Sequence, residues 1–192
     1  MEPIGIFGGT FDPIHIGHLI NAQVVFEKRN LERIIFIPCH ISPHKLDRIS
    51  SSDDDRLNML KLAISDHPYF DYSDFEINQG DISYTYHTLI EFKKKYEEIE
   101  LIIGYDNLLV FDKWFEPDKI FDMARVVVMQ RPFEENIKST NKYFSEAIII
   151  NTPFIDISST ELRQRVKQKL PLDFFVPEKV RDYIIKNELY IK

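Results

Sequence analysis

Short apolar runs along the chain alternate with longer segments in which apolar residues recur every three or four positions. The runs have the length of buried strands and lie at 4–7, 33–37, 100–104, 125–130 and 147–150. Segments with a helical period lie at about 16–28, 86–96, 159–169 and 176–187. Another runs to about residue 64, and Asp53 or Asp54 can cap its start. Residues 70–77 alternate like an extended segment. This order predicts an α/β protein with a doubly wound, mostly parallel sheet of five to six strands.

Length and hydrophobic content fit one domain. The chain has 192 residues, 44% of them hydrophobic, with 15 Phe and 9 Tyr. This is enough for one well-packed core and too few for two, so we expect a single domain over residues 1–192. Ligands of open parallel sheets bind beyond the carboxyl ends of the strands. The residues that follow Phe7, Ile37, Ile103, Met129 and Ile150 are therefore expected to converge.

The most informative segment is 8–18, GGTFDPIHIGH, which joins the first strand to the first helix. A helix N-terminus presents backbone N–H groups and a positive dipole to an anion. Gly8 and Gly9 let the backbone approach a phosphate without an intervening Cβ, and His15 and His18 add N–H donors. The alternative, a tight turn with two surface histidines, requires these features to coincide by accident. The segment predicts a phosphate cradle.

Further candidates follow the second and central strands. Lys45 can reach the ligand edge as a point charge, although a solvated loop lysine explains it equally well. Gly104 permits close backbone approach, and Asp106 can accept hydrogen bonds from ribose hydroxyls. Trp114 is the only tryptophan. Core packing is its usual role, but the polar residues before it fit a half-exposed stacking surface.

The segment 156–163, DISSTELR, follows the last strand. Ser158 or Ser159 can cap the helix that begins there, and capping alone would explain both. With Thr160, and with Arg163 one turn inside the helix, the hydroxyls and first-turn N–H groups form a second anion site. Two anion sites that face one crevice suit a triphosphate.

Composition narrows the partners. The formal net charge of −7 argues against broad nucleic-acid binding, which uses a basic surface, but local donors still allow a small anionic substrate. No apolar run approaches the roughly 20 residues that span a membrane, and no basic stretch precedes an apolar one as in a secretion signal. The single cysteine, Cys39, excludes an internal disulfide and fits a reducing cytoplasm. Whether copies of the chain form a homo-oligomer is left open.

Other chemistries fit less well. His15, His18, Cys39, His40 and His44 are residue types that bind zinc. The first two lie in a phosphate-type turn without the HExxH pattern of a helical zinc site, so we expect no metal held by the protein. The chain also has no GxSxG nucleophile elbow and no GxxxxGKS phosphate loop.

Together, GGTFDPIHIGH and ISSTELR resemble the HxGH class of nucleotidyltransferases, which transfer a nucleotidyl group from a nucleoside triphosphate. Within that class the chain is similar to the bacterial nicotinate-nucleotide adenylyltransferases over nearly its whole length. The segments PCHISPHK, RLNMLKLAI, GDISYTYHTL, GYDNLLVFDKW and FVPEKVRDYIIKNELY fall in that family's order and spacing. The resemblance implies a Rossmann-like nucleotidyltransferase fold and a cytoplasmic enzyme of NAD biosynthesis.

The resemblance also implies adenylyl transfer from ATP to nicotinate mononucleotide, which gives deamido-NAD and pyrophosphate, with Mg²⁺ bound through the substrate phosphates. It assigns the ATP phosphates to Gly8, Gly9, Thr10, Phe11, His15 and His18 on one side and to Ser158, Ser159, Thr160 and Arg163 on the other, with Lys45 between them. It assigns the adenosine moiety to Gly104 and Asp106, and the nicotinate to Tyr84, Thr85, Trp114 and Phe115. The catalytic set is His15, His18, Lys45 and Arg163, and the helical part from about 158 to 192 completes the ATP site.

One residue departs from the family pattern, and several related classes remain as alternatives. His87 stands where an SYTxDTL-like segment has an acidic residue, which leaves open how the substrate loop is braced. Phosphopantetheine adenylyltransferases share the HxGH turn but lack the Trp114 turn and the closing VPEKVRDYI segment. Cytidylyltransferases are a weaker alternative, and a nucleotide sensor without activity would not need two histidines at the departing phosphates. Class I aminoacyl-tRNA synthetases also carry HIGH, but their KMSKS-like loop is absent here.

Overall fold

One parallel sheet organises the chain in the computed structural model, which describes residues 2–43, 51–130 and 141–191. Six strands follow the order β3-β2-β1-β4-β5-β6, and every neighbouring pair is parallel. The strands are β1 (Ile4–Gly9), β2 (Ile34–Pro38), β3 (Phe70–Tyr72), β4 (Ile99–Gly104), β5 (Arg125–Gln130) and β6 (Ile148–Asn151). The predicted doubly wound α/β fold is confirmed, with six strands.

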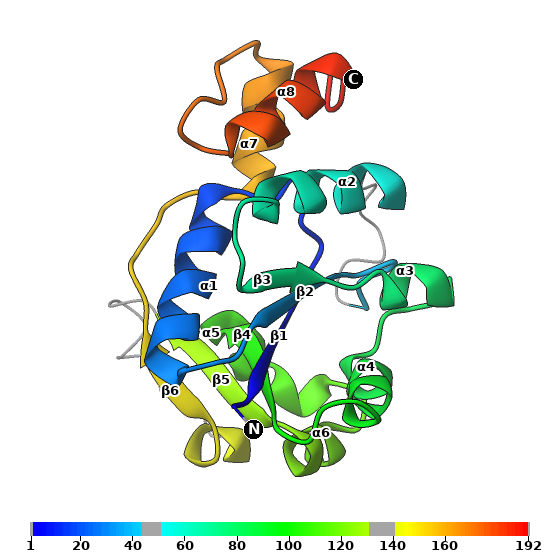
Figure 1. Ribbon diagram of the computed structural model, residues 1–192, viewed down its shortest axis with the longest axis vertical. Coiled ribbons are helices and arrows are strands. Elements are labelled where there is room, and N and C mark those ends of the chain that lie inside the picture. The colour runs from blue at the N-terminus through cyan, green and yellow to red at the C-terminus, as the bar shows by residue number, and fades with distance from the viewer. Residues whose placement is uncertain (1, 44–50, 131–140, 192) are drawn as a thin grey trace.

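Helices cover both faces of the sheet (Figure 1). They are α1 (Ile16–Arg29), α2 (Asp53–Ile64), α3 (Phe75–Gln79), α4 (Thr85–Lys93), α5 (Tyr105–Leu109), α6 (Pro117–Met123), α7 (Ser159–Lys167) and α8 (Glu178–Lys186), with the short 3₁₀ helices η1 (Phe111–Lys113) and η3 (Lys142–Ser145). Successive side chains of a strand point to opposite faces. Ile6 therefore packs in the core shared with α4, α5 and α6, and Phe7 in the core shared with α1, α2, α7 and α8. Of the helices in the described residues, none is long and apolar enough to cross a membrane.

The prediction of an extended segment over 70–77 is wrong beyond residue 72, where β3 ends and the chain turns into α3. Ser73 Oγ accepts a hydrogen bond from Phe75 N at 3.2 Å, which forms the turn that starts the helix. Gly80, at φ 69°, ends the helix in the left-handed conformation that glycine adopts at low cost. The apolar alternation fits both structures, and only the serine and the glycine distinguish them.

The helix predicted to start at Asp53 or Asp54 is capped one residue earlier. Ser52 Oγ accepts a hydrogen bond from Asp55 N at 3.1 Å, so the aspartates form an acidic first turn, where the helix dipole favours them. At α7, the predicted cap by Ser158 or Ser159 resolves to Ser158, whose Oγ accepts from Glu161 N at 3.2 Å. The ends of the other elements differ from the predicted ones by a few residues, as fraying of helix ends leads us to expect.

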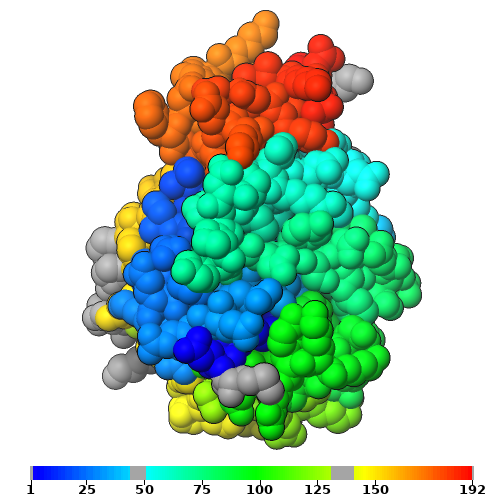
Figure 2. All heavy atoms as spheres, in the orientation of Figure 1, coloured from blue at the N-terminus to red at the C-terminus, as the bar shows by residue number. Residues whose placement is uncertain are grey.

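The two C-terminal helices cap the end of the molecule that carries α2 (Figure 2). The N-terminal strand begins at the opposite end (Figure 1). Ile16 N donates a hydrogen bond to the Phe175 carbonyl oxygen at 2.9 Å, and Tyr183 OH donates to Asp55 Oδ1 at 2.9 Å. The first contact holds the C-terminal segment over the start of α1, at the carboxyl edge of the sheet, and the second holds α8 against α2.

Candidate active site

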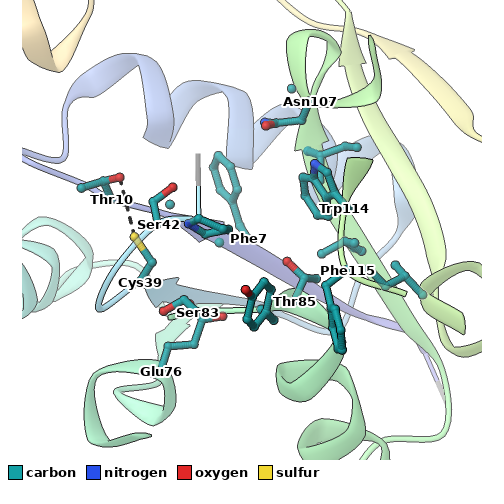
Figure 3. Close-up of a pocket in the computed structure, with 18 of the residues that line it drawn as sticks. Phe7, Thr10, Cys39, Ser42, Glu76, Ser83, Thr85, Asn107, Trp114 and Phe115 are labelled. Carbon is teal, nitrogen blue, oxygen red and sulfur yellow. Dashed lines mark hydrogen bonds between the residues drawn. The ribbon is translucent and has the colours of Figure 1, made fainter. Parts of the chain in front are cut away.

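Two adjoining cavities open beyond the carboxyl ends of β1, β2 and β4. The larger, about 500 Å³, lies between the turn after β1 and the start of α7. The smaller, about 220 Å³, extends from the same turn to the segment around Trp114 (Figure 3). Their common wall includes Gly8, Gly9, Thr10, Cys39, Ser42 and Asn107. The predicted convergence is confirmed for the segments after β1, β2, β4 and β6, whereas residues 131–140, which follow β5, lie outside the described residues.

The turn between β1 and α1 presents its backbone to both cavities. A Cβ on Gly9 would lie 2.8 Å from the Phe11 ring, so the turn closes over this ring only with glycine. A Cβ on Gly8 would meet no atom within 4 Å, so this backbone is open on the side of the cavities. Phe11 adopts φ 49°, and its ring is buried. The turn therefore has the accessible backbone that a phosphate cradle requires.

His15 and His18 form a stacked pair at the start of α1. Their ring centroids lie 3.7 Å apart, and His18 Nδ1 accepts a hydrogen bond from His15 N at 3.3 Å. Because Nδ1 is the acceptor, neutral His18 carries its proton on Nε2. His15 is buried, and this burial lowers its pKa to about 4, so its ring is neutral at pH 7. Both residues line the larger cavity, and a neutral imidazole ring has one N–H group to donate.

The start of α7 forms the opposite wall of the larger cavity. Ser159 Oγ donates to the Pro13 carbonyl oxygen at 2.9 Å, and Arg163 Nη1 donates to the Asp12 carbonyl oxygen at 2.7 Å. These bonds attach α7 directly to the turn after β1. The residues that line this cavity include Gly8, Gly9, Thr10, Phe11, His15, His18, Ser158, Ser159, Thr160 and Arg163. The structure thus brings the two predicted anion sites together, while the hydroxyls of Ser158 and Ser159 also hold the fold.

Aromatic side chains surround the smaller cavity. Trp114 stacks on the buried Phe111 at 4.7 Å between ring centroids and 22° between planes, and it is half-buried beside the cavity. Tyr84, Thr85 and Phe115 also line this cavity, and the ring centroids of Tyr84 and Phe115 lie 4.9 Å apart. Figure 3 shows Trp114 and Asn107 across the cavity from Thr10 and Ser42. All four predicted nicotinate-binding residues therefore share this wall.

His87 lies outside the smaller cavity, and a buried carboxyl group braces the segment that joins α3 to α4. Glu76 Oε1 accepts a hydrogen bond from Thr88 Oγ1 at 2.6 Å, which joins α3 to α4. Burial raises the pKa of Glu76 above its ordinary value. His87 is exposed, and its ring contacts Tyr84 and Phe115 at 5.9 and 5.6 Å between centroids. The acidic residue expected at position 87 is thus not required to hold α4 in place.

The sequence did not reveal the side-chain contacts of two residues that fix the turn after β1, Arg56 and Asp12. Arg56 is fully buried on α2, donates from Nη1 to the Thr10 carbonyl oxygen at 2.9 Å and pairs with Asp53. Asp12 is 4% exposed and is held from three other segments of the chain. The sequence signal for Arg56 was its position next to Leu57, among the apolar residues of a helix face, where a charged residue is rarely found without a partner.

Two predictions have other outcomes. Lys45 lies outside the described residues. Asp106 is exposed at the start of α5 and lines neither cavity, whereas the next residue, Asn107, lines both. The contact of Asp106 with ribose stays a prediction. Across residues 2–43, 51–130 and 141–191, no three His, Cys, Asp or Glu side chains gather as metal ligands would.

The sequence of the chain matches a known protein family. Residues 6–165 match the family described as Cytidylyltransferase-like. A curated relative from Caldicellulosiruptor bescii, named "Probable nicotinate-nucleotide adenylyltransferase", is 40% identical over 195 residues, 97% of this chain and 98% of the relative. A relative of the same name from Hydrogenobaculum sp. is 41% identical over 190 residues, 98% of each chain.

Solved structures have the same fold. The Plasmodium falciparum nicotinic acid mononucleotide adenylyltransferase complexed with APC superposes with a TM-score of 0.76 at 22% identity, over 99% of this chain and 98% of the other. The same enzyme complexed with NaAD gives a TM-score of 0.77. At this identity the likeness extends to the fold alone, and the family follows from the sequence matches over nearly the full length. The chain belongs to the nicotinate-nucleotide adenylyltransferase family, within the Cytidylyltransferase-like group.

Proposed function

We propose that this chain transfers the adenylyl group of ATP to nicotinate mononucleotide, with deamido-NAD and pyrophosphate as products. The observation that carries the proposal is the wall that the two cavities share. A cavity with anion donors on two sides adjoins an aromatic pocket through residues 7–10, Ser42 and Asn107. A nucleotide in each cavity brings its phosphate to this wall. The name of the curated relatives describes the same transfer.

The reaction needs alignment and charge stabilisation. A phosphate oxygen of the mononucleotide bonds to the α-phosphorus of ATP, and the bond from that phosphorus to the bridging oxygen breaks. The electron pair leaves with pyrophosphate. The second pKa of a phosphate monoester is about 6, so the attacking group is largely dianionic at pH 7 and needs no general base. His15, His18 and Arg163 donate to the triphosphate and hold it in line, and we include Lys45 in this set.

Mg²⁺ belongs to this proposal as an ion that arrives with the triphosphate. Asp12 is the one carboxylate among the described residues that line the larger cavity, and Tyr190 OH already donates to it at 2.7 Å. The wall thus offers no cage of carboxylates, and Mg²⁺ often binds through phosphate oxygens and water. Bound in this way, it neutralises charge on the phosphates.

We also propose that the chain acts as one cytoplasmic domain, in which the part from about 158 to 192 completes the ATP site.

An acceptor panel tests the proposed function. The full chain is incubated with ATP, Mg²⁺ and one acceptor at a time: nicotinate mononucleotide, its amide, or 4′-phosphopantetheine. Pyrophosphate release is followed, and the dinucleotide product is separated by chromatography. We expect turnover with nicotinate mononucleotide and none with phosphopantetheine. Turnover with phosphopantetheine alone, or with CTP in place of ATP, would assign the chain to one of the other activities of this class.

The acid form of the mononucleotide is expected to be preferred over the amide. The first-turn amides of α4, at Thr85 and Tyr86, have no acceptor within their own helix and can bind a carboxylate. A carboxylate accepts hydrogen bonds on both oxygens, whereas a carboxamide directs its NH₂ group at one donor. An unsatisfied buried donor costs about 1–3 kcal/mol, or about 5- to 150-fold in kcat/KM. Equal kcat/KM values for the two acceptors, measured side by side, would contradict this recognition.

Trp114→Ala is expected to raise the KM for nicotinate mononucleotide and to leave the KM for ATP nearly unchanged. Stacking of one ring on an aromatic side chain is worth about 1–3 kcal/mol, which corresponds to a rise of about 5- to 150-fold. The pyridinium ring also gains from the electron-rich indole face. Steady-state kinetics with each substrate varied in turn measures both constants.

Phe121→Ala is the matched control. Phe121 packs edge-on against Phe111, the ring that also supports Trp114, at 5.2 Å between centroids, but it does not line the cavity. It should cost stability without changing either KM. If the two variants behave alike, with loss of stability and parallel effects on both substrates, Trp114 packs the core and does not bind the ring.

A further inference from the structure

Near the C-terminus, Tyr190 contacts the turn after β1 through a hydrogen bond to Asp12. Tyr190 OH donates to Asp12 Oδ1 at 2.7 Å, between residues that are 178 positions apart in the sequence. Tyr190 adopts φ 65°, and its ring packs with the core between α1, α2 and the C-terminal helices. The hydroxyl also lies 3.9 Å from Met59 Sδ. Apolar contacts thus hold the rest of the ring, while the hydroxyl interacts with the Asp12 carboxylate and with the side chain of Ser51.

Asp12 connects this hydroxyl to the larger cavity. Its carboxylate is buried and also accepts from Ser51 N at 3.3 Å. Arg163 Nη1 donates to the Asp12 carbonyl oxygen at 2.7 Å and lies 3.9 Å from its carboxylate oxygen Oδ2. Asp12 therefore holds the guanidinium of Arg163 at the cavity wall, on the side where the triphosphate is proposed to bind.

We infer that Tyr190 is a positioning residue for the triphosphate, acting through Asp12 on Arg163 and on the turn after β1. This inference rests on the proposed function for the identity of the nucleotide. With its hydroxyl in place, Asp12 keeps one orientation and presents a fixed anchor to Arg163. Without it, the buried carboxylate loses its short hydrogen bond and turns toward its remaining partners, of which Arg163 is the cation. The guanidinium is then drawn away from the phosphates.

The hydroxyl is a permanent donor. Burial, followed by the nearby Asp12 carboxylate, raises the pKa of Tyr190 far above its ordinary value, so the group stays protonated in any neutral assay. Phenylalanine would keep the ring and its packing while it removes the donor. The role of the hydroxyl is thus separable from the role of the ring.

Tyr190→Phe tests the inference, with Tyr183→Phe as the matched control. Tyr183 lies on α8, and its hydroxyl donates to Asp55 Oδ1 at 2.9 Å and accepts from Asn58 Nδ2 at 3.2 Å, on the outer side of α2. Each variant thus loses one tyrosine hydroxyl bond to a carboxylate of the same protein. For Tyr190→Phe we expect the KM for ATP to rise about 3- to 20-fold, with the KM for nicotinate mononucleotide within twofold of wild type. Tyr183→Phe should change neither constant.

A double-mutant cycle with Asp12→Asn separates positioning from general stability. If Tyr190 acts through Asp12, the two effects on the KM for ATP are not additive, and Tyr190→Phe adds little in the Asp12→Asn background. Binding of a non-hydrolysable ATP analogue, measured by calorimetry, gives the same comparison without turnover. A wild-type enzyme inactive on nicotinate mononucleotide that still shows the binding difference would refute the proposed acceptor alone. Additive effects, or a Tyr190→Phe variant that loses only thermal stability, would overturn the positioning role.

Discussion

We expect His18→Ala to lower kcat by on the order of 10²–10³-fold, because the loss of one donor to charge that develops in the transition state costs this much. In adenylyl transfer this charge accumulates on the departing pyrophosphate. The fold should survive, since His18 is half-buried at the cavity wall and α1 keeps its apolar face. Steady-state pyrophosphate release measures kcat, and thermal unfolding checks the fold.

The geometry of the histidine pair explains why this effect is expected at His18. His18 accepts the hydrogen bond of His15 N on Nδ1, which assigns the proton to Nε2. His15 is buried, whereas His18 is more exposed to the larger cavity. Of the two rings, His18 is therefore the better placed to follow the departing phosphate. His18→Gln, which keeps an N–H donor of similar reach, should retain more activity than His18→Ala.

His67→Ala is the control for this series. His67 is an exposed histidine in the loop after α2, lines neither cavity and should leave kcat unchanged. A His18→Ala enzyme with near-normal kcat would remove His18 from the transition state. A covalent enzyme intermediate is a separate matter, which the stereochemistry at the α-phosphorus decides: direct transfer inverts the configuration, and two successive displacements retain it.

Local patterns were sufficient to predict where the cavities lie. The apolar runs predict parallel strands, parallel strands predict a ligand edge, and the glycine and histidine residues of 8–18 follow the first strand directly. Each step depends on residues close together in sequence. For the same reason the segment 156–163 could be predicted as a second anion site, and the structure places it against the first through Ser159 and Arg163.

Contacts between distant segments could not be predicted in this way. No periodicity links Tyr190 to Asp12, because the contact depends on how the C-terminal segment lies over the start of α1. Arg56 was missed for a related reason: a buried arginine breaks the apolar face of α2, and only the folded chain shows that the Thr10 carbonyl oxygen is its partner. The short helix α3 was missed because five residues give too little of a helical period to outweigh the alternation of β3.

Arg29→Met is expected to destabilise the protein by about 3 kcal/mol, because it leaves a buried carboxylate without its main partner. Glu100 is in β4, its side chain is 1% exposed, and its two oxygens accept from Arg29 Nη2 and Nε at 2.6 and 2.8 Å. Arg125 is the nearest other cation, at 4.0 Å. For a chain of this size, a loss of this magnitude lowers the melting temperature by roughly 6–12 °C.

Because Glu100 is more deeply buried than Arg29, replacing one or the other should lower the free energy of unfolding by different amounts. The Arg29 side chain is 25% exposed, so in Glu100→Met the guanidinium can turn to water, and the loss should be smaller than in Arg29→Met. The double variant Arg29→Met/Glu100→Met removes both charges and should recover much of the stability, since apolar side chains can replace a buried ion pair at little cost. Urea unfolding of the four proteins gives the comparison. The pair lies at the start of β4, whereas the cavities open beyond the strand's other end at Gly104, so kcat per folded molecule should stay constant. A double variant less stable than Arg29→Met alone would mean that the arginine stabilises the sheet by its packing and not by its charge.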